Sequence, residues 1–441
     1  MKAFNSFFVA HRYLLLLVSC CFCAAHGLSQ TPSVVAGTGV AGYGGDGGLA
    51  TAAQIKNPSN VIADAMGNIY IADNSNSRIR KVNTAGVIST IAGTGVPGMS
   101  GDGGPATAAT FYSPNGLAID GVGNIYVADI NANNVRKISA SGIISTIAGV
   151  GGLGPLGDGG PATAAHVGSP NGIVLDQGGN IYISDFSGNR VRKINPAGII
   201  STYAGNGSGT YAGDGGPATN ASIYRPGGIC LDHWGNLYIA DDGNSRIRKV
   251  DPSGIITTIA GTGAVGGSGD GGPATAATFG QPTGVRIDGY GNIYIGDLGG
   301  SVRKVNTAGT ISSVASEPAS GSIWVTCNGS VYISSASSNR IYYLASSGVC
   351  PSLDEPTIIG RDEAVMSIFP NPAHGYFELR LNSDASEPVQ ITVNDVAGRT
   401  IATRMAATNE DVSFRINSAA GLYFVTAVTV HGVWTQRVVI E

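Results

Sequence analysis

The sequence is poor in charged residues, and its central part is almost free of histidine and glutamate. Charged residues make up 12% of the chain, about half of the usual ~25%. Between residues 30 and 348 there are two histidines, His166 and His233, and one glutamate, Glu317. The HExxH, GxSxG and P-loop motifs do not occur in the sequence. These shortages argue against the common routes to a general base or an activated nucleophile, so we assign no catalytic residue, metal ligand or cofactor.

Long hydrophobic runs are also missing beyond the N-terminus, so no transmembrane span is predicted. Lys2 and Arg12 precede an apolar run at residues 13–25, which is shorter than the ~20 residues that a span needs. Small residues at Ala25 and Gly27 fit a cleavage site, so residues 1–27 are predicted to be a signal peptide. Leu17-Val18-Ser19-Cys20 also resembles a bacterial lipobox, which leaves lipid attachment to a surface as the alternative.

Three cysteines remain after the predicted signal peptide. Cys327 and Cys350 are allowed to pair in an oxidising compartment, although sequence alone leaves their pairing open. Cys230 lies in an apolar strand pattern, which predicts a small core residue.

Glycine is abundant, with 67 residues, and much of it belongs to an internal repeat. Units begin at residues 35, 91, 147, 203 and 259, a constant spacing of 56 residues. Each unit contains four apolar runs rich in Ile, Val and Tyr, which predict strands; in the second unit they are residues 116–120, 124–129, 134–139 and 143–148. Four strands per repeat are typical of a propeller blade.

The ends of the repeat predict six blades. First strands start near Val61, Leu117, Ile173, Ile229, Val285 and Ile323. The sixth unit contains only three strands, whereas residues 34–36 form a spare fourth strand ahead of the first blade. Pairing of that spare strand with blade six would close the ring and remove an exposed edge. The fold class is therefore all-β: a six-bladed β-propeller with velcro closure, followed by a small C-terminal β-sandwich.

The repeated motifs resemble a known family. PNGLAID, GNIYVAD and NVRKI, at residues 114–120, 123–129 and 134–138, look like the NHL repeat, and the resemblance supports an NHL-type propeller over residues 28–348. NHL propellers include RNA-binding modules, protein-binding modules and a few lyase-type enzymes, so the resemblance does not select a function.

The C-terminal segment has a different character. Residues 349–365 are predicted to be a linker, and residues 366–441 alternate apolar residues with turn signals. FPNPAHG, VNDVAGR and GLYFV, at residues 369–375, 393–399 and 421–425, resemble the C-terminal sorting domain of type IX secretion cargo. The resemblance implies that the type IX secretion machinery is a partner. It also implies that the protein is secreted or reaches the outer-membrane surface of a Gram-negative bacterium.

Charged residues recur at fixed positions of the repeat. Each GDGG loop carries one aspartate, whereas calcium takes 6–8 oxygen ligands, so we expect these aspartates to hold glycine-rich turns through backbone N–H groups. The five are Asp46, Asp102, Asp158, Asp214 and Asp270. A second aspartate ends the second strand, and an Arg-Lys pair such as Arg80-Lys81 follows on the third. We expect this aspartate and arginine to form an ion pair at the surface, and such pairs add only ~0–1 kcal/mol to the free energy of unfolding. A nucleic-acid partner is not expected, because it needs a concentrated basic patch.

Residues that break the symmetry of the repeat are the candidates for a binding site. Connections between blades are expected on one face together with the loops between second and third strands and the GDGG loops. Tyr112, His166, Tyr224 and Arg225 lie in these connections, and Tyr and Arg are enriched in binding hot spots. The alternative is that the aromatic residues of these connections only cover the blade tops. His233 is expected on the opposite face.

One further break lies deeper in the propeller. Arg286 occupies the middle of a first strand where the other blades have uncharged residues, and Trp324 holds the equivalent position of the next blade. A buried charge needs a partner, so we expect a cation–π contact between them, either structural or part of a ligand site.

Two functions follow from these patterns. The preferred hypothesis is an exported or cell-surface binding or scaffold protein that recognises a protein or a glycan through the loop-rich face. The alternative is a metal-dependent lyase or hydrolase with its site at the propeller axis, for which Asn115 and Asn171 would be the ligands.

Overall fold

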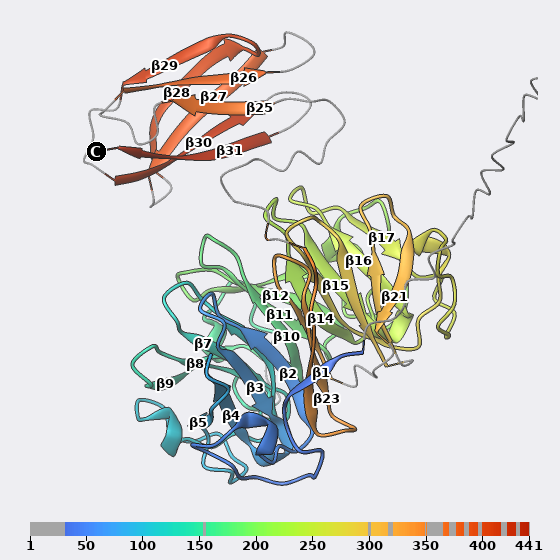
Figure 1. Cartoon of the computed structure of the whole chain (residues 1–441). Coiled ribbons are helices and arrows are strands. Elements are labelled where there is room, and N and C mark those ends of the chain that lie inside the picture. The colour runs from blue at the N-terminus through green and yellow to red at the C-terminus, as the bar shows by residue number, and fades with distance from the viewer. Residues whose placement is uncertain are drawn as a thin grey trace, which may run out of the picture.

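The computed structural model describes residues 31–440 with gaps (Figure 1). The described ranges are 31–152, 156–298, 301–315, 321–348, 350, 365–369, 376–382, 388–395, 399–415, 421–428 and 433–440. The predicted signal peptide and lipobox, Glu317 and nearly all of the predicted linker lie outside them.

Six four-stranded antiparallel sheets form the N-terminal part of the chain, which confirms the six-bladed propeller. The first two blades are β2 (Pro58–Ala63), β3 (Ile69–Asp73), β4 (Arg78–Val82) and β5 (Ile88–Ala92), then β6 (Pro114–Ile119), β7 (Ile125–Asp129), β8 (Asn134–Ile138) and β9 (Ile144–Ala148). The third and fourth are β10 (Pro170–Leu175), β11 (Ile181–Asp185), β12 (Arg190–Ile194) and β13 (Ile200–Ala204), then β14 (Pro226–Leu231), β15 (Leu237–Asp241), β16 (Arg246–Val250) and β17 (Ile256–Ala260). The fifth is β18 (Pro282–Ile287), β19 (Ile293–Asp297), β20 (Ser301–Val305) and β21 (Ile311–Ala315).

The sixth blade joins the two ends of the propeller. It consists of β22 (Ile323–Val325), β23 (Val331–Ser335), β24 (Arg340–Leu344) and the N-terminal strand β1 (Ser33–Ala36). β1 pairs antiparallel with β24, with Ser33 opposite Tyr343 and Val34 opposite Tyr342. Ala36 is fully buried in a cluster that also contains Ile55 and Ile341. The predicted velcro closure is therefore confirmed.

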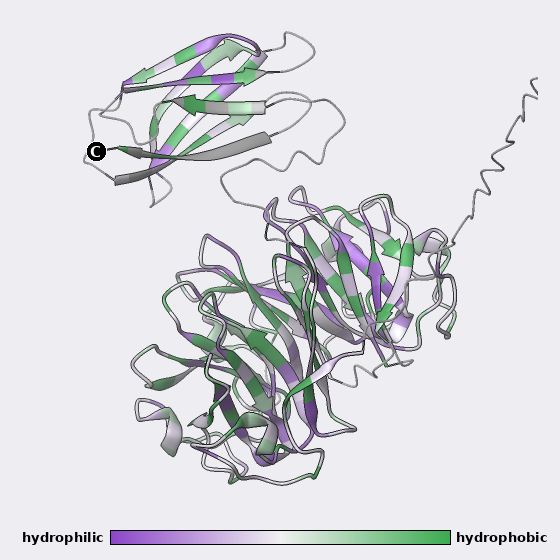
Figure 2. Ribbon diagram, in the orientation of Figure 1, coloured by the Kyte–Doolittle hydropathy of each residue, from purple (hydrophilic) through white to green (hydrophobic). Residues whose placement is uncertain are grey.

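Close approach of neighbouring first strands explains the glycines that follow their prolines. A Cβ on Gly172 would lie 2.8 Å from the carbonyl oxygen of Gly227 in the next blade, and a Cβ on Gly228 would lie 2.9 Å from the Cα of Gly284. Side chains of any size are excluded there, because real Cβ atoms do not come so close to backbone. Apolar residues recur along the strands of the propeller (Figure 2). Buried apolar residues from neighbouring blades pack together into clusters and form the core.

The GDGG loops are part of the connections between blades, and each one runs along the outer strand of the blade that follows it. In the first blade Gly47 N donates to Ile88 O at 2.9 Å, and Ala50 N donates to Gly86 O at 2.8 Å. Each GDGG loop is followed by a single 3₁₀ turn, which is Ala50–Ala52 ahead of the first blade. The equivalent turns are Ala106–Ala108, Ala162–Ala164, Ala218–Asn220 and Ala274–Ala276. The loops thereby cover outer strand edges that would otherwise be open for pairing.

Two further 3₁₀ turns, Asn74–Asn76 and Asp242–Asn244, follow the second strands of the first and fourth blades. Among the described residues there is no α-helix, and no helix is long and apolar enough to cross a membrane.

The three cysteines after the predicted signal peptide form one disulfide and one free thiol. Cys327 and Cys350 form a disulfide with their Cα atoms 5.0 Å apart, which ties the chain after β24 to the turn between β22 and β23. Cys230 is a free, buried core residue, as predicted.

The C-terminal segment is a small β-sandwich with its own core. One sheet contains β25 (Val365–Phe369), β26 (Tyr376–Asn382) and β29 (Asp411–Arg415). The other contains β28 (Thr400–Ala407), β27 (Pro388–Asp395), β30 (Gly421–Val428) and β31 (Val433–Ile440). Phe377 and Phe414 stack between their strands with ring centroids 5.4 Å apart, among buried residues such as Ile391 and Val425. The domain boundaries at residues 348 and 366 stay a prediction.

Removal of β1 tests the closure. A chain that begins after Gly39 should unfold at a midpoint temperature lower by about 5 °C or more, because β24 loses its partner, and its open edge should promote aggregation. Differential scanning calorimetry and light scattering measure the two effects. A chain that begins at Thr31 keeps β1 and is the control; equal midpoints for the two chains would contradict the closure.

Candidate functional site

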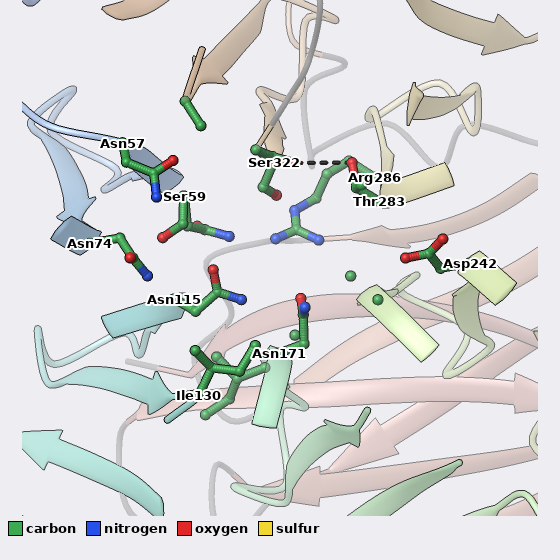
Figure 3. Close-up of a pocket in the computed structure, with 17 residues that line it drawn as sticks. Asn57, Ser59, Asn74, Asn115, Ile130, Asn171, Asp242, Thr283, Arg286 and Ser322 are labelled. Atoms are coloured by element: carbon green, nitrogen blue, oxygen red, sulfur yellow. Dashed lines mark hydrogen bonds between the residues drawn. The ribbon is translucent and has the colours of Figure 1, made fainter. Parts of the chain in front are cut away.

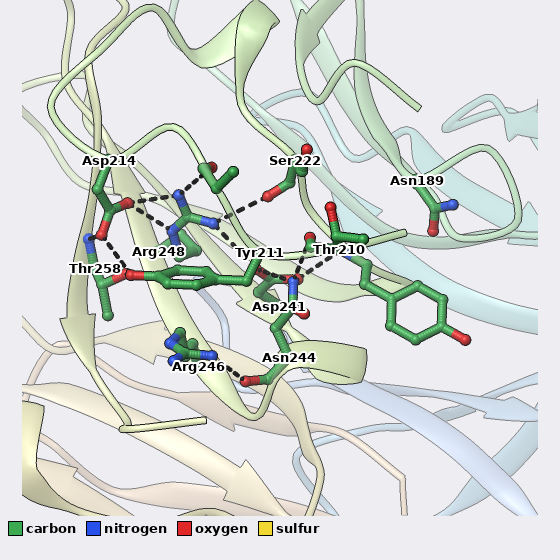
Figure 4. Close-up of polar contacts among 12 residues, drawn as sticks. Asn189, Thr210, Tyr211, Asp214, Ser222, Asp241, Asn244, Arg246, Arg248 and Thr258 are labelled. Carbon is green, nitrogen blue, oxygen red and sulfur yellow. Dashed lines mark hydrogen bonds and ion pairs between the residues drawn. The ribbon is translucent and has the colours of Figure 1, made fainter. Parts of the chain in front are cut away.

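A buried arginine on the third strand of each of the first five blades organises the loops around it. In the fourth blade the Arg248 guanidinium contacts Asp214 of the GDGG loop at 2.5 Å and Asp241 at the end of β15 at 3.2 Å (Figure 4). Asp214 also accepts from Thr258 N on the outer strand at 3.1 Å. The same contact between arginine and GDGG aspartate, at 2.5–2.6 Å, occurs for Arg80, Arg136, Arg192 and Arg303.

These contacts correct the expectation of surface ion pairs, because the side chains of all five arginines are fully buried. Burial raises the pKa of Asp214, but the hydrogen bond from Thr258 and the charge of Arg248 outweigh it, so the net pKa lies below the ordinary value. Removing one partner of a buried pair typically costs ~3–5 kcal/mol, since the other charge is left uncompensated. The pairs are therefore structural, and their arginines do not form an exposed basic ridge.

The aspartates that end the second strands position the connections between blades. Asp241 accepts from Tyr224 N at 2.7 Å, and Asp129 accepts from Tyr112 N at 2.8 Å. Asp73, Asp185 and Asp297 hold the equivalent backbone groups. Invariant blade residues thus fix the variable segments in place. We call the end of the propeller formed by these connections and by the loops after the second strands the loop-rich face.

A polar cavity of about 270 Å³, the axial pocket, opens where the six first strands meet. Its ring is one residue from each blade, the one after the position of the strand-starting proline: Ser59, Asn115, Asn171, Gly227, Thr283 and Gly321. The side chains of Asn115, Asn171 and Arg286 point into the same space (Figure 3). Asn74, Ile130, Asp242 and Ala336, which follow the second strands, complete the mouth.

Three buried polar side chains of the axial pocket have atoms with no hydrogen-bond partner among the described residues. They are Asn60 Oδ1, Asp242 Oδ1 and Arg286 Nε, and the exposed fractions of these residues are only 7%, 7% and 9%. Most buried polar atoms in folded proteins are paired. Six other buried atoms without partners among the described residues lie within the blades, and four of them are Nε atoms of the structural arginines. The unpaired oxygens of Asn60 and Asp242, two residues that line one cavity, therefore carry more weight than Arg286 Nε as a sign of a ligand site.

Arg286 is held by backbone and by an aromatic ring. Its Nη1 donates to Ile229 O at 2.8 Å and to Val285 O at 2.9 Å. The guanidinium carbon lies 5.5 Å from the centroid of the Trp324 ring, so the predicted cation–π contact is present. Burial lowers the pKa of Arg286 and raises the pKa of the neighbouring Cys230 thiol to about 12. In the part of the chain that the structure describes, Arg286 forms no ion pair with a carboxylate.

Asp242 is the titratable group of this pocket. Burial raises its pKa from the ordinary value of 3.8 to about 6, against a hydrogen bond from the Gln281 side chain and the charge of Arg225. Burial also raises the pKa of four of the strand-ending aspartates that hold the connections, so the shift of Asp242 is informative because this residue lines a cavity.

A second hollow, the rim pocket, lies between the third and fourth blades. It has a volume of about 260 Å³ and is lined by Phe186, Ser187, Asn189, Tyr224 and Arg225. The Arg225 guanidinium lies 5.8 Å from the Phe186 ring centroid and 5.2 Å from that of Tyr224. The backbone of Arg225 is in the left-handed region (φ 51°). Asn57 and Ser169, at the same position of their repeats, have the same conformation, so it is a property of the repeat.

The structure therefore brings together only some of the predicted site residues. Tyr224 and Arg225 share the rim pocket, and Arg286 with its neighbour Trp324 lies at the axial pocket. Tyr112 is exposed but lines neither cavity, and the His166 ring nitrogen Nδ1 lies 2.6 Å from Gly152 O, within the same connection. His233 stacks on Trp234 in the turn between β14 and β15.

Sequence reasoning missed Asp242, Asn60 and Phe186. Asp242 and Phe186 occupy one position of the repeat, directly after the strand-ending aspartate, where the other blades have Asn74, Ile130, Leu298 and Ala336. This column varies more than its neighbours, so comparing the blades column by column at the loop-rich face would have found it.

Ligands for a metal ion are few in these cavities. Asn115 and Asn171 line the axial pocket as the metal hypothesis required, but they offer carboxamides, and Asp242 is the one carboxyl group lining it. Across the described residues, no three His, Cys, Asp or Glu side chains are grouped so that they could hold a metal ion.

Comparison with known proteins agrees with the repeat and with the C-terminal motifs. A family model described as the teneurin NHL domain matches residues 24–96, 95–156, 154–212 and 207–268, which together span more than half of the chain. The chain belongs to the teneurin NHL domain family. A model of the secretion system C-terminal sorting domain matches residues 367–441, and it indicates export to the cell surface or the medium and a contact with the type IX machinery.

The relatives of this NHL protein are much longer chains. Human teneurin-4 is 31% identical over 231 residues, which are 47% of this chain and 8% of that protein. Chicken teneurin-1 is 31% identical over 254 residues, 51% of this chain and 9% of that protein. This chain thus spans less than a tenth of these relatives.

A solved structure of a protein of unknown function from Bacteroides thetaiotaomicron shares the fold. It has a TM-score of 0.51 and 19% identity, and the match covers 71% of this chain and 74% of that one.

The raised pKa of Asp242 predicts how stability depends on pH. The folded protein holds the proton more tightly than the unfolded chain, so the stability that this proton confers is full below about pH 3.8 and is lost as the pH rises through about 6. Asp242→Asn, which stays neutral, should therefore raise the free energy of unfolding at pH 8 by about 3 kcal/mol and change it little at pH 3.5. Urea unfolding at both pH values measures this, and a gain that is equal at both would contradict the titration of Asp242.

Deletion of residues 366–441 tests the sorting domain. The truncated protein should accumulate in the periplasm with a folded propeller, because the sandwich has a core of its own. Cell fractionation and limited proteolysis measure location and folding. A truncated protein that reaches the surface or medium at the normal level would show that export does not use this domain.

Proposed function

We propose that this exported NHL propeller is a surface binding protein that holds a protein or glycan ligand on its loop-rich face. The single observation that carries the proposal is the axial pocket, where Asn60, Asp242 and Arg286 keep buried polar atoms without partners. A ligand that pairs with these atoms would recover the free energy that their burial costs, about 1–3 kcal/mol for each unpaired group.

The contrast between residues repeated in every blade and residues that vary between blades supports the same function. The repeated Arg and Asp residues are engaged in ion pairs within blades, as for Arg248 with Asp214 and Asp241. The residues that differ from blade to blade line the two cavities. A unique pose for an asymmetric ligand requires such asymmetric contacts, and residues that are identical in every blade cannot provide them.

Binding is proposed ahead of the metal-dependent lyase or hydrolase. The axial pocket supplies carboxamides and hydroxyl groups from Asn115, Asn171, Ser59 and Thr283 and one carboxyl from Asp242. Carboxamides and hydroxyls are suited to hydrogen bonding of a polar ligand, whereas a catalytic metal centre usually uses several His or carboxylate ligands.

Substitutions at the rim pocket test whether the ligand binds on the loop-rich face. Replacing Tyr224 and Arg225 together with Ala should weaken capture of the ligand about tenfold or more, because Tyr and Arg in pockets are common hot spots. The ligand is first identified on a glycan array and by pull-down from surface extract, and affinity is then measured by biolayer interferometry.

Two matched variants complete the test. Arg225→Asn removes the guanidinium but tolerates the left-handed backbone, so it should weaken binding and leave thermal stability within about 0.5 kcal/mol. His233→Ala, on the opposite face, should leave binding unchanged. If His233→Ala abolished binding and the double variant did not, the ligand face would be the opposite one.

A further inference from the structure

The charge of Arg286 is the feature of the axial pocket that hydrogen bonding of a neutral ligand does not explain. Arginine remains protonated in proteins, and this one is 9% exposed with no ion-paired carboxylate among the described residues. Its contacts are two backbone carbonyls and the Trp324 ring. Buried charges are normally paired, so the missing counter-charge is expected from a ligand.

Asp242 does not supply that charge, although it lines the same cavity. The two residues form no ion pair, and the cation that acts on the Asp242 carboxyl is Arg225, with Gln281 as its hydrogen-bond donor. The charged partner of Asp242 is thus Arg225 of the rim pocket and not Arg286. Arg286 lies deeper, bonded to the first strands of the fourth and fifth blades.

The remaining lining defines the rest of the ligand. Asn60 Oδ1 and Asp242 Oδ1 are acceptors without partners, so the ligand must carry donors. The carboxamides of Asn115 and Asn171 and the hydroxyl of Ser59 both donate and accept, which matches sugar hydroxyl groups. A volume of about 270 Å³ is at the lower limit of small-molecule sites, ~300 Å³, and fits one sugar unit.

We propose that the axial pocket binds the carboxylate-bearing sugar unit of an acidic glycan, with Arg286 as the cation for the carboxylate and the asparagine ring as the partner of the hydroxyl groups. This inference rests on the proposed binding function and narrows its ligand class. Arg286 is well suited to the role, because a guanidinium binds a carboxylate with two parallel hydrogen bonds. A chain-terminal carboxylate of a protein shares the charge but lacks the hydroxyl donors.

The test uses the exported chain and small probes. Isothermal titration calorimetry at pH 7 compares D-glucuronate, D-galacturonate and D-mannuronate with the corresponding neutral hexoses. At least one hexuronate should bind about tenfold more tightly than its neutral hexose, which corresponds to one charge-assisted contact. A tripeptide with a free C-terminal carboxylate should bind more weakly than that hexuronate.

Variants then assign the preference to Arg286. Arg286→Met should abolish the difference between hexuronate and hexose without lowering the unfolding midpoint, since it removes a charge that has no ion-pair partner in the free protein. His233→Ala, on the opposite face, should leave the difference unchanged. If Arg286→Met lowers the unfolding midpoint and keeps the selectivity, Arg286 is only a structural partner of Trp324, and the inference fails.

The remaining outcomes separate this inference from the broader proposal. If no hexuronate binds, or acid and neutral sugars bind equally, the acidic-sugar class is wrong. A tripeptide that binds as tightly as the hexuronates would replace the glycan by a protein terminus. In each case the binding function itself stands if the Tyr224/Arg225 double variant weakens capture of the ligand, and it falls if that variant has no effect.

Discussion

The buried arginine on the third strand is the interaction on which the rest of the propeller depends. Arg248 joins three segments that are far apart along the chain: the loop at Asp214, the second strand at Asp241 and its own strand. Asp241 then fixes the connection that carries Tyr224. In the other four of these blades the buried arginine likewise engages the aspartate of its GDGG loop, so one type of buried contact recurs around most of the ring and helps to make the frame rigid.

The sixth blade has no buried arginine on its third strand and is stabilised by other contacts. Its third strand has Tyr342 where the other blades have the arginine, and its second strand ends on Ser335 in place of aspartate. The pairing of β1 with β24 and the disulfide from Cys327 to Cys350 act there instead. The blade that holds both ends of the propeller is thus secured by backbone pairing and a covalent bond.

The fold could be predicted from the sequence because repetition shows each strand several times. The strand predicted at residues 143–148 is Ile144–Ala148, and the spare N-terminal strand pairs where closure required it. The course of the GDGG loops along the outer strands was not predicted, because a loop rich in glycine gives no periodic signal of the surface that it covers. The same loops carry Asp46 and its equivalents to the buried arginines, a contact between residues 34 positions apart that no local pattern indicates.

The candidate site was harder to predict than the fold. Arg286 and Trp324 could be found because a charge interrupts an apolar column, and the contact between them is present. Asp242 could not be distinguished from the aspartates of the repeat by its residue type, because its burial, the main cause of its raised pKa, is visible only in the structure. Tyr112 occupies the same position of the repeat as Tyr224, and its backbone N–H is held by Asp129 as that of Tyr224 is held by Asp241. Residue type and position therefore could not tell that Tyr224 lines a cavity and Tyr112 does not.

The pairing of Ser33 with Tyr343 also determines the order in which the molecule can assemble. These two residues are separated by 310 positions, so this contact has a very high contact order and forms late in folding. During synthesis from the N-terminus onward, the first strand emerges long before its partner, and the ring stays open until residue 343 has emerged. The disulfide from Cys327 to Cys350 needs seven residues more. Blades one to five can therefore fold in sequence while the chain is still emerging, and the ring closes only when the last strand of the propeller is available.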